Sequence, residues 1–412
     1  MHGEIIAIGD ELTSGRVLNT TSGLAARRLF AAGHEVRAMS IIGDDPELIG
    51  VTLKAALARS RFIIVTGGLG ATSDDLTNQA VATALDRPTV LNREMLAGIF
   101  GDQKNSGDAM LEKIAWLPTG SEVLKPRGGM AGHRLEHAGV PIFFLPGVPH
   151  EMEELLEDCV LPELAARAAG GPGLVHHELY RVFGLGETEI NQRCLALAAK
   201  IPGLAIGYYP VHPEIHVSLT LQGADREADF RIADTLLRQA LAPYLFASGD
   251  QTLPTVVGAL LTANNQTLTV AESCTGGRLA ANLTGVAGSS AYFLGGVVAY
   301  SNELKTKYLG VAPELLQEQG AVSRATARAM ARGILTRTNA AIGVSITGIA
   351  GPGGGSTEKP VGTVCFGLAT AASTLDFQFR FPGVRWQVQA AAAHQALELV
   401  RRHLLDILPE KE

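Results

Sequence analysis

The chain has 412 residues, 46% of them hydrophobic and only 18% charged, which allows a sizeable buried core and excludes a globally disordered protein. Its 41 acidic residues outnumber its 34 lysines and arginines, so the formal net charge is −7. Because proteins that act on nucleic acid usually carry a basic face, this charge argues against nucleic acid as a partner.

The cysteines and the uncharged stretches exclude further classes. The four cysteines are far apart and form no CxxC pair, so neither a disulfide framework nor a zinc ribbon is indicated. The uncharged stretches at 279–302 and 338–357 are broken by Gly, Ser, Thr and Asn, which is typical of strands and loops in a core and not of membrane spans. The N-terminal residues lack the features of a signal peptide. We therefore expect a cytoplasmic protein with no membrane contact.

Strand and helix patterns alternate over residues 1–168. The predicted strands are 5–8, 36–42, 62–65 and 142–145, and the predicted helices are 18–32 and 46–58. Such alternation predicts βαβ units, a mostly parallel sheet and an α/β fold. Ligands of these sheets bind at the carboxyl ends of the strands, so we expect the residues that follow the strands to form a site.

Two pairs of adjacent carboxylates follow predicted strands, Asp10 with Glu11 and Asp74 with Asp75. The second pair comes after the glycine-rich run at 67–70, whose backbone N–H groups can approach an anion. Carboxylates beside a phosphate cradle suit Mg²⁺, which prefers oxygen ligands and bridges to substrate phosphates. The alternative is a tight turn followed by helix N-caps, with Asp74 or Asp75 capping the next helix.

Two polar or glycine-rich stretches divide the rest of the chain. The run at 169–173 predicts a linker, and 248–250 marks a second boundary. The segment between them has a predicted strand at 215–221 and predicted helices from 188 and at 228–241. The last segment begins with a helix, and its further predicted elements are strands at 267–271, 292–299, 340–346 and 375–381 and a final amphipathic helix at 386–408.

The run Ala271–Gly277 lies between a buried strand and a helix, where a nucleophile would be exposed yet rigidly held. Backbone N–H groups after Ser273 and the helix dipole could stabilise an oxyanion there. The alternative is that Ser273 or Thr275 only caps the following helix. Cys274, beside the helix N-terminus, is a second and minor candidate nucleophile.

The available bases favour a lysine over a histidine. Both histidines of this segment, His394 and His403, lie on the final helix, so a Ser–His–acid triad is not indicated. Lys305 and Lys307 follow a buried strand and a polar turn, where partial desolvation would lower the pKa of a lysine and let it act as a base. The alternative is a solvated lysine with no catalytic role. A glycine-rich loop at 348–355 suits either an anion cradle or a flexible lid.

Together these motifs resemble the CinA family over essentially the whole chain. The carboxylate pairs, the glycine run and Leu145–Pro149 resemble the molybdopterin-binding-like domain of that family. Ala271–Gly277, Tyr300–Asn302, Gly348–Gly351 and Lys359–Thr363 are similar to its nicotinamide mononucleotide (NMN) deamidase domain. The resemblance implies a three-layer molybdopterin-binding-like domain at 1–168, a small α+β KH-like linker domain at 174–246 and an α/β deamidase domain at 251–412.

Two activities are implied by this resemblance. The N-terminal domain would hydrolyse ADP-ribose to AMP and ribose 5-phosphate with a divalent metal held by Asp74 and Asp75. The C-terminal domain would hydrolyse NMN to nicotinate mononucleotide and ammonia without a cofactor. The family also implies a homodimer.

The resemblance further assigns roles to single residues. Ser273 would attack the carboxamide, Lys305 with Tyr300 would move protons, and Ser290 and Thr347 would complete the polar network. The implied substrate-binding residues are Gly276, Gly277, Gly348 and Gly351 in the C-terminal domain, and Asp10, Glu11, Asn19, Gly68 and Gly70 in the N-terminal domain. Two other functions fit the same motifs: a nucleotide or pterin sensor without turnover, or a competence accessory that contacts recombination proteins.

Overall fold

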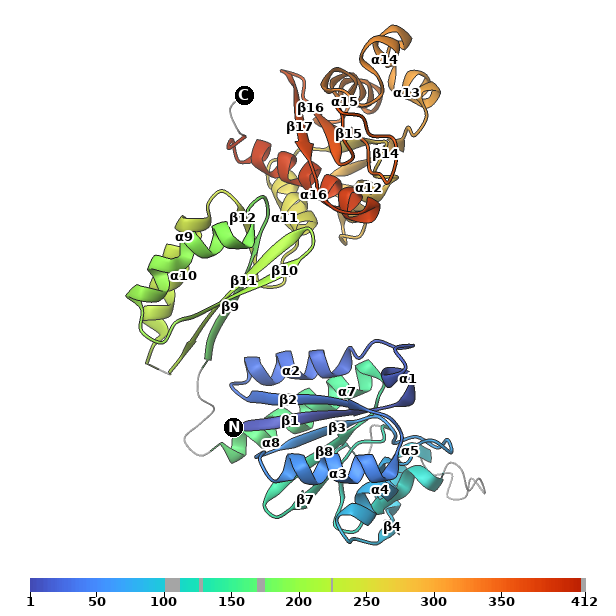
Figure 1. Cartoon of the computed structure of the whole chain (residues 1–412), viewed down its shortest axis with the longest axis vertical. Coiled ribbons are helices and arrows are strands. Elements are labelled where there is room, and N and C mark those ends of the chain that lie inside the picture. The colour runs from blue at the N-terminus through green and yellow to red at the C-terminus, as the bar shows by residue number, and fades with distance from the viewer. Residues whose placement is uncertain (101–111, 126–128, 169–174, 224, 409–412) are drawn as a thin grey trace. The chain divides into compact units, whose positions relative to one another are not determined.

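The structure is a computed structural model that describes residues 1–100, 112–125, 129–168, 175–223 and 225–408. It divides into two compact units, Met1–His176 with Leu221–Glu227 and His177–Thr220 with Ala228–Glu412. The predicted α/β fold is confirmed, because helices are interspersed with the strands of the main sheets (Figure 1). The predicted linker at 169–173 lies outside the described residues, and the three domain boundaries stay a prediction.

The N-terminal sheet has six strands in the order β2-β1-β3-β8-β7-β6. Their bounds, in that order, are β2 (Glu35–Ile42), β1 (His2–Ile8), β3 (Ile63–Thr66), β8 (Val140–Leu145), β7 (His133–His137) and β6 (Glu122–Val123). The first four strands run parallel to one another, and β7 runs antiparallel to both of its neighbours, β8 and β6. The four strands predicted from the sequence are the four parallel ones, so their carboxyl ends meet at one edge of the sheet.

Alternate residues of the parallel strands enter two different cores. Ile5 packs with α2 (Thr21–Ala31), α7 (Pro149–Leu155), the π-helical turn η2 (Leu156–Val160) and α8 (Leu161–Arg167). Ile6 packs with α3 (Pro46–Leu57) and α4 (Thr77–Ala84) on the other face (Figure 1). Because side chains alternate along a strand, a sheet covered on both faces requires continuously apolar strands such as β1 and β3.

Shorter elements complete the N-terminal unit. They are α1 (Asp10–Thr13), α5 (Arg93–Phe100), η1 (Lys113–Ala115), and the antiparallel pair β4 (Thr89–Leu91) and β5 (Trp116–Pro118). Helix α1 directly follows β1, and α4 follows β3 after a loop, so both open at the carboxyl edge of the sheet.

The middle segment forms a four-stranded sheet in the order β10-β11-β9-β12, with two helices beside it (Figure 1). Its elements are β9 (Val175–Val182), α9 (Glu187–Lys200), β10 (Ala205–Val211), β11 (Glu214–Gln222), α10 (Glu227–Leu241) and β12 (Leu245–Ser248). The predicted strand at 215–221 and both predicted helices are therefore present. β9 and β10 were not predicted, because their polar residues break the apolar alternation.

The C-terminal sheet has five strands in the order β14-β13-β15-β16-β17, of which the first three are parallel. The strands are β13 (Leu268–Glu272), β14 (Phe293–Val298), β15 (Ile342–Gly348), β16 (Thr363–Ala369) and β17 (Thr374–Arg380). One face packs against α11 (Leu253–Ala263), α12 (Arg278–Thr284) and α16 (Arg385–Leu404). The other packs against α13 (Asn302–Leu309), α14 (Pro313–Gln319) and α15 (Arg324–Thr338). No helix in the described ranges is both long enough and apolar enough to span a bilayer.

One buried histidine makes the N-terminal core sensitive to acid. His133 is 1% exposed and stacks on Phe144 with ring centroids 4.5 Å apart. Neither of its ring nitrogens has a hydrogen-bond partner in the part of the chain that the structure describes. Burial therefore lowers the pKa of His133 to about 3. Between that value and 6.5, the unfolded chain binds a proton that the folded chain does not, so the stability of this unit falls as the pH falls.

We expect His133→Phe to remove this acid sensitivity. Below pH 6.5 the variant should gain stability over the wild type by up to about 1.4 kcal/mol per pH unit, because phenylalanine keeps the stacking but binds no proton. Calorimetric unfolding of the N-terminal unit between pH 7.5 and pH 5 measures the gain. His137→Phe, on the same strand but not buried, is the control, and an equal gain in both variants would refute the assignment to His133.

Candidate active sites

The backbone fixes Ser273 at the end of the central strand β13. Its N–H donates to the carbonyl of Ile346 at 2.9 Å, which extends the pairing of β13 with β15 by one residue. Gly276 and Gly277 follow with φ of +64° and +97°, a left-handed conformation that glycine adopts without strain. This turn leads into α12 and leaves Ser273 only 7% exposed.

Glu272 caps α12, a role that the sequence did not reveal. Its buried carboxylate accepts hydrogen bonds from the N–H groups of Gly277 (3.1 Å), Leu279 (3.1 Å) and Ala280 (2.8 Å). The cap is therefore supplied by Glu272, and neither Ser273 nor Thr275 is committed to it, contrary to the alternative reading. The N–H of Gly277 is used in this cap, and its role in binding substrate stays a prediction.

Lys305 reaches Ser273 from α13. The lysine is 1% exposed, and its Nζ donates to Ser273 Oγ at 3.1 Å and to the carbonyls of Ala299 and Tyr300 at 3.0 and 3.2 Å. Burial lowers the pKa of Lys305, and no carboxylate in the described ranges forms an ion pair with it. A neutral amine has two N–H groups for the two carbonyls and one lone pair, which is left to accept the proton of Ser273.

Arg385 joins this site from the first turn of α16. Its Nη2 donates to the hydroxyl of Tyr300 at 2.8 Å, and its Nη1 donates to the carbonyl of Gly351 at 2.8 Å. The Tyr300 hydroxyl thus contacts Arg385, while the contact of Tyr300 with Lys305 is made by the backbone carbonyl. Arg385 has no motif that marks it in the sequence, where the final helix is recognisable only by its apolar stripe.

Of three other predicted residues, Thr347 and Gly348 lie on β15, the strand next to Ser273, and Ser290 lies at the other end of the sheet. Thr347 is buried on β15 and donates to the carbonyl of Ala321 at 2.7 Å. Gly348 ends β15 and pairs with Val364. Ser290 is exposed in the turn η3 (Ser289–Ala291), which precedes β14 and so lies at the amino end of the sheet, opposite Ser273. The prediction that Ser290 joins the polar network is therefore not met within this chain.

The alternative nucleophile and bases fit this site poorly. Burial raises the pKa of the Cys274 thiol to about 12, so it is protonated at neutral pH. His394 packs against Phe183 and Phe246, and burial lowers its pKa to about 3. It lies more than two turns along α16 from Arg385.

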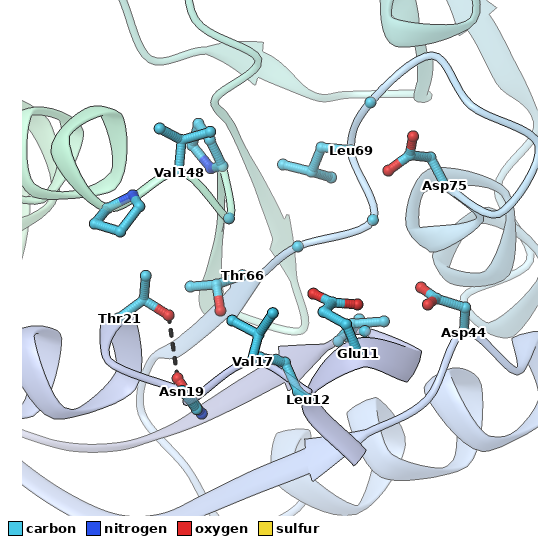
Figure 2. Close-up of a pocket in the computed structure, with 18 of the residues that line it drawn as sticks. Glu11, Leu12, Val17, Asn19, Thr21, Asp44, Thr66, Leu69, Asp75 and Val148 are labelled. Carbon is cyan, nitrogen blue, oxygen red and sulfur yellow. Dashed lines mark hydrogen bonds between the residues drawn. The ribbon is translucent and has the colours of Figure 1, made fainter. Parts of the chain in front are cut away.

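The N-terminal domain has a separate cavity of about 440 Å³ at the carboxyl edge of its sheet. Glu11, Asp44 and Asp75 line it together with Thr66 and the apolar side chains of Leu69 and Val148 (Figure 2). Gly67 forms its floor with φ of +93°, and a Cβ there would lie 2.2 Å from the carbonyl oxygen of Ile8. Only glycine allows this approach of the loop to β1.

Asp44 is a cavity carboxylate that follows β2. Asp45 caps α3 by accepting from the N–H of Leu48 at 2.8 Å, which leaves Asp44 to line the cavity. Asp10 and Asp44 exchange hydrogen bonds, since each carboxylate accepts from the backbone N–H of the other at 3.2 and 2.9 Å. Burial and the negative charges of Asp10, Glu11 and Asp74 raise the pKa of Asp44.

The remaining predicted residues of this site are held by local contacts. Asp75 accepts from the N–H and hydroxyl of Thr72, so it closes the loop and does not cap α4. Asn19 lines the cavity but caps α2, since its Oδ1 accepts from the N–H of Ser22 at 3.1 Å. Figure 2 shows its second contact, with the hydroxyl of Thr21. The predicted Gly68 and Gly70 line the cavity as well, whereas Asp10 does not.

The carboxylates of the cavity fit a metal that arrives with a substrate. The described residues contain no group of three or more Asp, Glu, His or Cys side chains close enough to hold an ion by themselves. Mg²⁺ commonly needs only one or two carboxylates when substrate phosphates complete its coordination. Asp44 is consistent with this fit: burial raises its pKa most, the charges of Asp10, Glu11 and Asp74 raise it further, and a cation would offset that negative charge.

Comparison with known proteins agrees with this architecture. The profile "Probable molybdopterin binding domain" matches residues 4–166, "Damage-inducible protein CinA KH domain" matches 177–247 and "CinA C-terminal domain" matches 250–404. A CinA-like protein of Desulfotalea psychrophila is 46% identical over 408 residues, which cover 98% of each chain. The chain belongs to the CinA family.

Other relatives of this CinA-family chain carry related names. A putative competence-damage inducible protein of Moorella thermoacetica is 39% identical over 412 residues and covers 98% of this chain and 99% of its own. A crystal structure of a CinA superfamily protein from Klebsiella pneumoniae is 40% identical, covers 37% of this chain and 96% of its own, and has a TM-score of 0.37.

The lowered pKa of Lys305 predicts a pH-dependent stability. Between its lowered pKa and 10.5 the unfolded chain binds a proton that the folded chain does not, so wild-type stability should rise with pH through this window. Lys305→Met lacks this proton and should lose that dependence, whatever its absolute stability. Unfolding followed by calorimetry from pH 7 to pH 10.5 measures the difference. Lys307→Met, on the exposed side of α13, should behave as wild type; equal slopes in all three proteins would show that Lys305 titrates normally.

Proposed function

We propose that the C-terminal domain is an amidohydrolase that deamidates NMN, with Ser273 as the nucleophile and Lys305 as the general base. The observation that carries the proposal is the buried contact of 3.1 Å between Lys305 Nζ and Ser273 Oγ. Two backbone carbonyls hold the lysine, and its lowered pKa favours the neutral amine that a base must be. A buried lysine without a counter-charge is costly, which argues for a functional role.

The reaction follows from these two groups. Ser273 Oγ forms a bond to the carboxamide carbon while its proton passes to Lys305 Nζ. The C–N bond then breaks, and Lys305 returns the proton to the nitrogen, which leaves as ammonia. Water attacks the resulting ester as Lys305 takes one of its protons and passes it to Ser273 Oγ, which releases nicotinate mononucleotide and restores the serine.

The charges around Ser273 suit NMN as the substrate. Its pyridinium ring is cationic, and a neutral lysine avoids the repulsion that a buried ammonium would exert on it. Its phosphate needs a cation, and Arg385 is an exposed one tied to the turn after Tyr300 and to the glycine loop at Gly351. Gly276 supports access, because a Cβ at this position would meet only open space.

For the N-terminal domain we propose metal-dependent hydrolysis of the pyrophosphate of ADP-ribose to AMP and ribose 5-phosphate. One or two of the cavity carboxylates, which are Glu11, Asp44 and the predicted metal residues Asp74 and Asp75, would hold the ion together with the substrate phosphates. When bound, the ion would neutralise the phosphate charge and activate water. The alternatives are a domain that binds a nucleotide or pterin without turnover, and a competence accessory that contacts other proteins. Release of AMP from ADP-ribose in the presence of a divalent metal would distinguish the hydrolase from both alternatives.

Substitutions in the Ser273–Lys305 contact test the deamidase directly. Ser273→Ala should lower ammonia release from NMN by more than about a hundredfold, because no other group can form the ester. Lys305→Arg should be almost as damaging, since guanidinium stays protonated and cannot accept the serine proton. Cys274→Ala is the matched control and should retain most activity. The assignment is wrong if Cys274→Ala is inactive while Ser273→Ala still turns over.

Adjacent aspartates test the N-terminal site. Asp44→Asn should suppress AMP release and leave deamidation near the wild-type rate, because it removes a cavity carboxylate. Asp45→Asn is the matched control, since asparagine caps a helix about as well as aspartate. Chelator should separate the two activities in the same way. Deamidation that fails with chelator would contradict the metal-free assignment of the C-terminal site, and equal AMP release by both variants would contradict the role of Asp44.

A further inference from the structure

A second cavity of about 600 Å³ lies on the other side of the glycine loop in the N-terminal domain. It is built from three elements beyond that loop: α4 contributes Asn78 and Gln79, the β4–β5 pair contributes Thr89 and Trp116, and η1 contributes Lys113. The two cavities share four lining residues, which are Gly68, Leu69, Gly70 and Asp75. The loop from Gly68 to Asp75 is therefore a common wall with a cavity on each face.

The two cavities differ sharply in chemistry. The first is lined by acidic side chains and contains no lysine or arginine among its lining residues. The second contains Lys113, one tryptophan, two side-chain amides and only one acid, Asp75. Lys113 Nζ donates to the backbone carbonyl of Thr72, which places its charge on the dividing loop. A substrate with a phosphate in its middle and two unlike ends would match this pair of cavities.

The second cavity presents groups that recognise a flat heteroaromatic ring. Trp116 is 44% exposed although it lies on a paired strand, opposite Leu91. Asn78 lines this cavity, and its side-chain oxygen has no hydrogen-bond partner among the described residues. Aromatic side chains bind bases by stacking, and amides pair with the donor and acceptor atoms on a base edge.

We propose that this second cavity binds the adenine of ADP-ribose, stacked on Trp116, with the amides of Asn78 and Gln79 facing its edge. The pyrophosphate would then cross the loop at Gly68–Gly70, past Lys113, into the acidic cavity, where the metal and the terminal ribose would lie. The inference rests on the proposed ADP-ribose hydrolysis and adds which end of the substrate occupies which cavity.

Tryptophan fluorescence tests the proposal by binding, independently of catalysis. The chain has two tryptophans, Trp116 and Trp386, so the full-length Trp386→Phe variant reports on Trp116 alone. Titration with AMP should quench this emission, because a stacked purine contacts the indole. Ribose 5-phosphate, which has a phosphate but no base, is the matched control and should leave it unchanged.

Kinetics on the full-length protein give the second readout. Trp116→Ala should raise the KM for ADP-ribose about tenfold or more, with kcat nearly unchanged, and Trp116→Phe should restore most of the loss because it keeps a stacking face. NMN deamidation, which occurs in the other unit, should be unaffected and checks that the variant is folded.

The outcomes separate this inference from the proposed function. Hydrolysis of ADP-ribose with no AMP quenching and no change in KM for Trp116→Ala would overturn the inference and leave the function standing. Quenching by AMP without hydrolysis of ADP-ribose would support the adenine site and overturn the proposal that the N-terminal domain is an enzyme. Quenching by a pterin but not by AMP would overturn the adenine assignment and show that the cavity binds a pterin ring. No quenching and no hydrolysis would overturn both.

Discussion

The C-terminal site depends on one constraint, the burial of a lysine without a counter-charge. An ammonium inside a core is costly, and the fold supplies Lys305 with two carbonyls and a hydroxyl but no carboxylate from the described residues. Burial therefore shifts Lys305 towards the neutral amine, and its Nζ lies within hydrogen-bond distance of Ser273 Oγ. The packing of α13 against the end of β13 thus brings together the two groups that we propose as base and nucleophile.

Glu272 shows how the fold keeps this arrangement intact. A carboxylate directly before Ser273 could have paired with Lys305 and kept it protonated. Instead, its oxygens bind three N–H groups at the start of α12, where the helix dipole also favours negative charge. The turn gains rigidity, and the lysine keeps its lowered pKa. Arg385 lies at the exposed side of the site. A cation there can bind an anion without the desolvation penalty that a buried charge carries.

The sequence predicted the elements well where a pattern is local. The parallel strands of both main sheets, the turn at Ser273 and the position of Lys305 after a buried strand all follow from apolar runs and their ends. Asp44, Glu272, Arg385 and Trp116 did not follow, because their roles depend on which neighbour the fold supplies. Either Asp44 or Asp45 could cap α3, and only the backbone path decides. Ser290 was misplaced for the same reason, since the end of the sheet at which it lies is set by strand direction.

The most direct test of this account is to identify the covalent intermediate. NMN is mixed with excess enzyme, the reaction is quenched with acid over a series of times, and the peptides are analysed by mass spectrometry. The account predicts an ester on Ser273 with the added mass of NMN less ammonia, appearing before nicotinate mononucleotide and absent from Lys305→Arg. An adduct on Cys274, or full conversion to ammonia with no ester on Ser273 at any time, would contradict it.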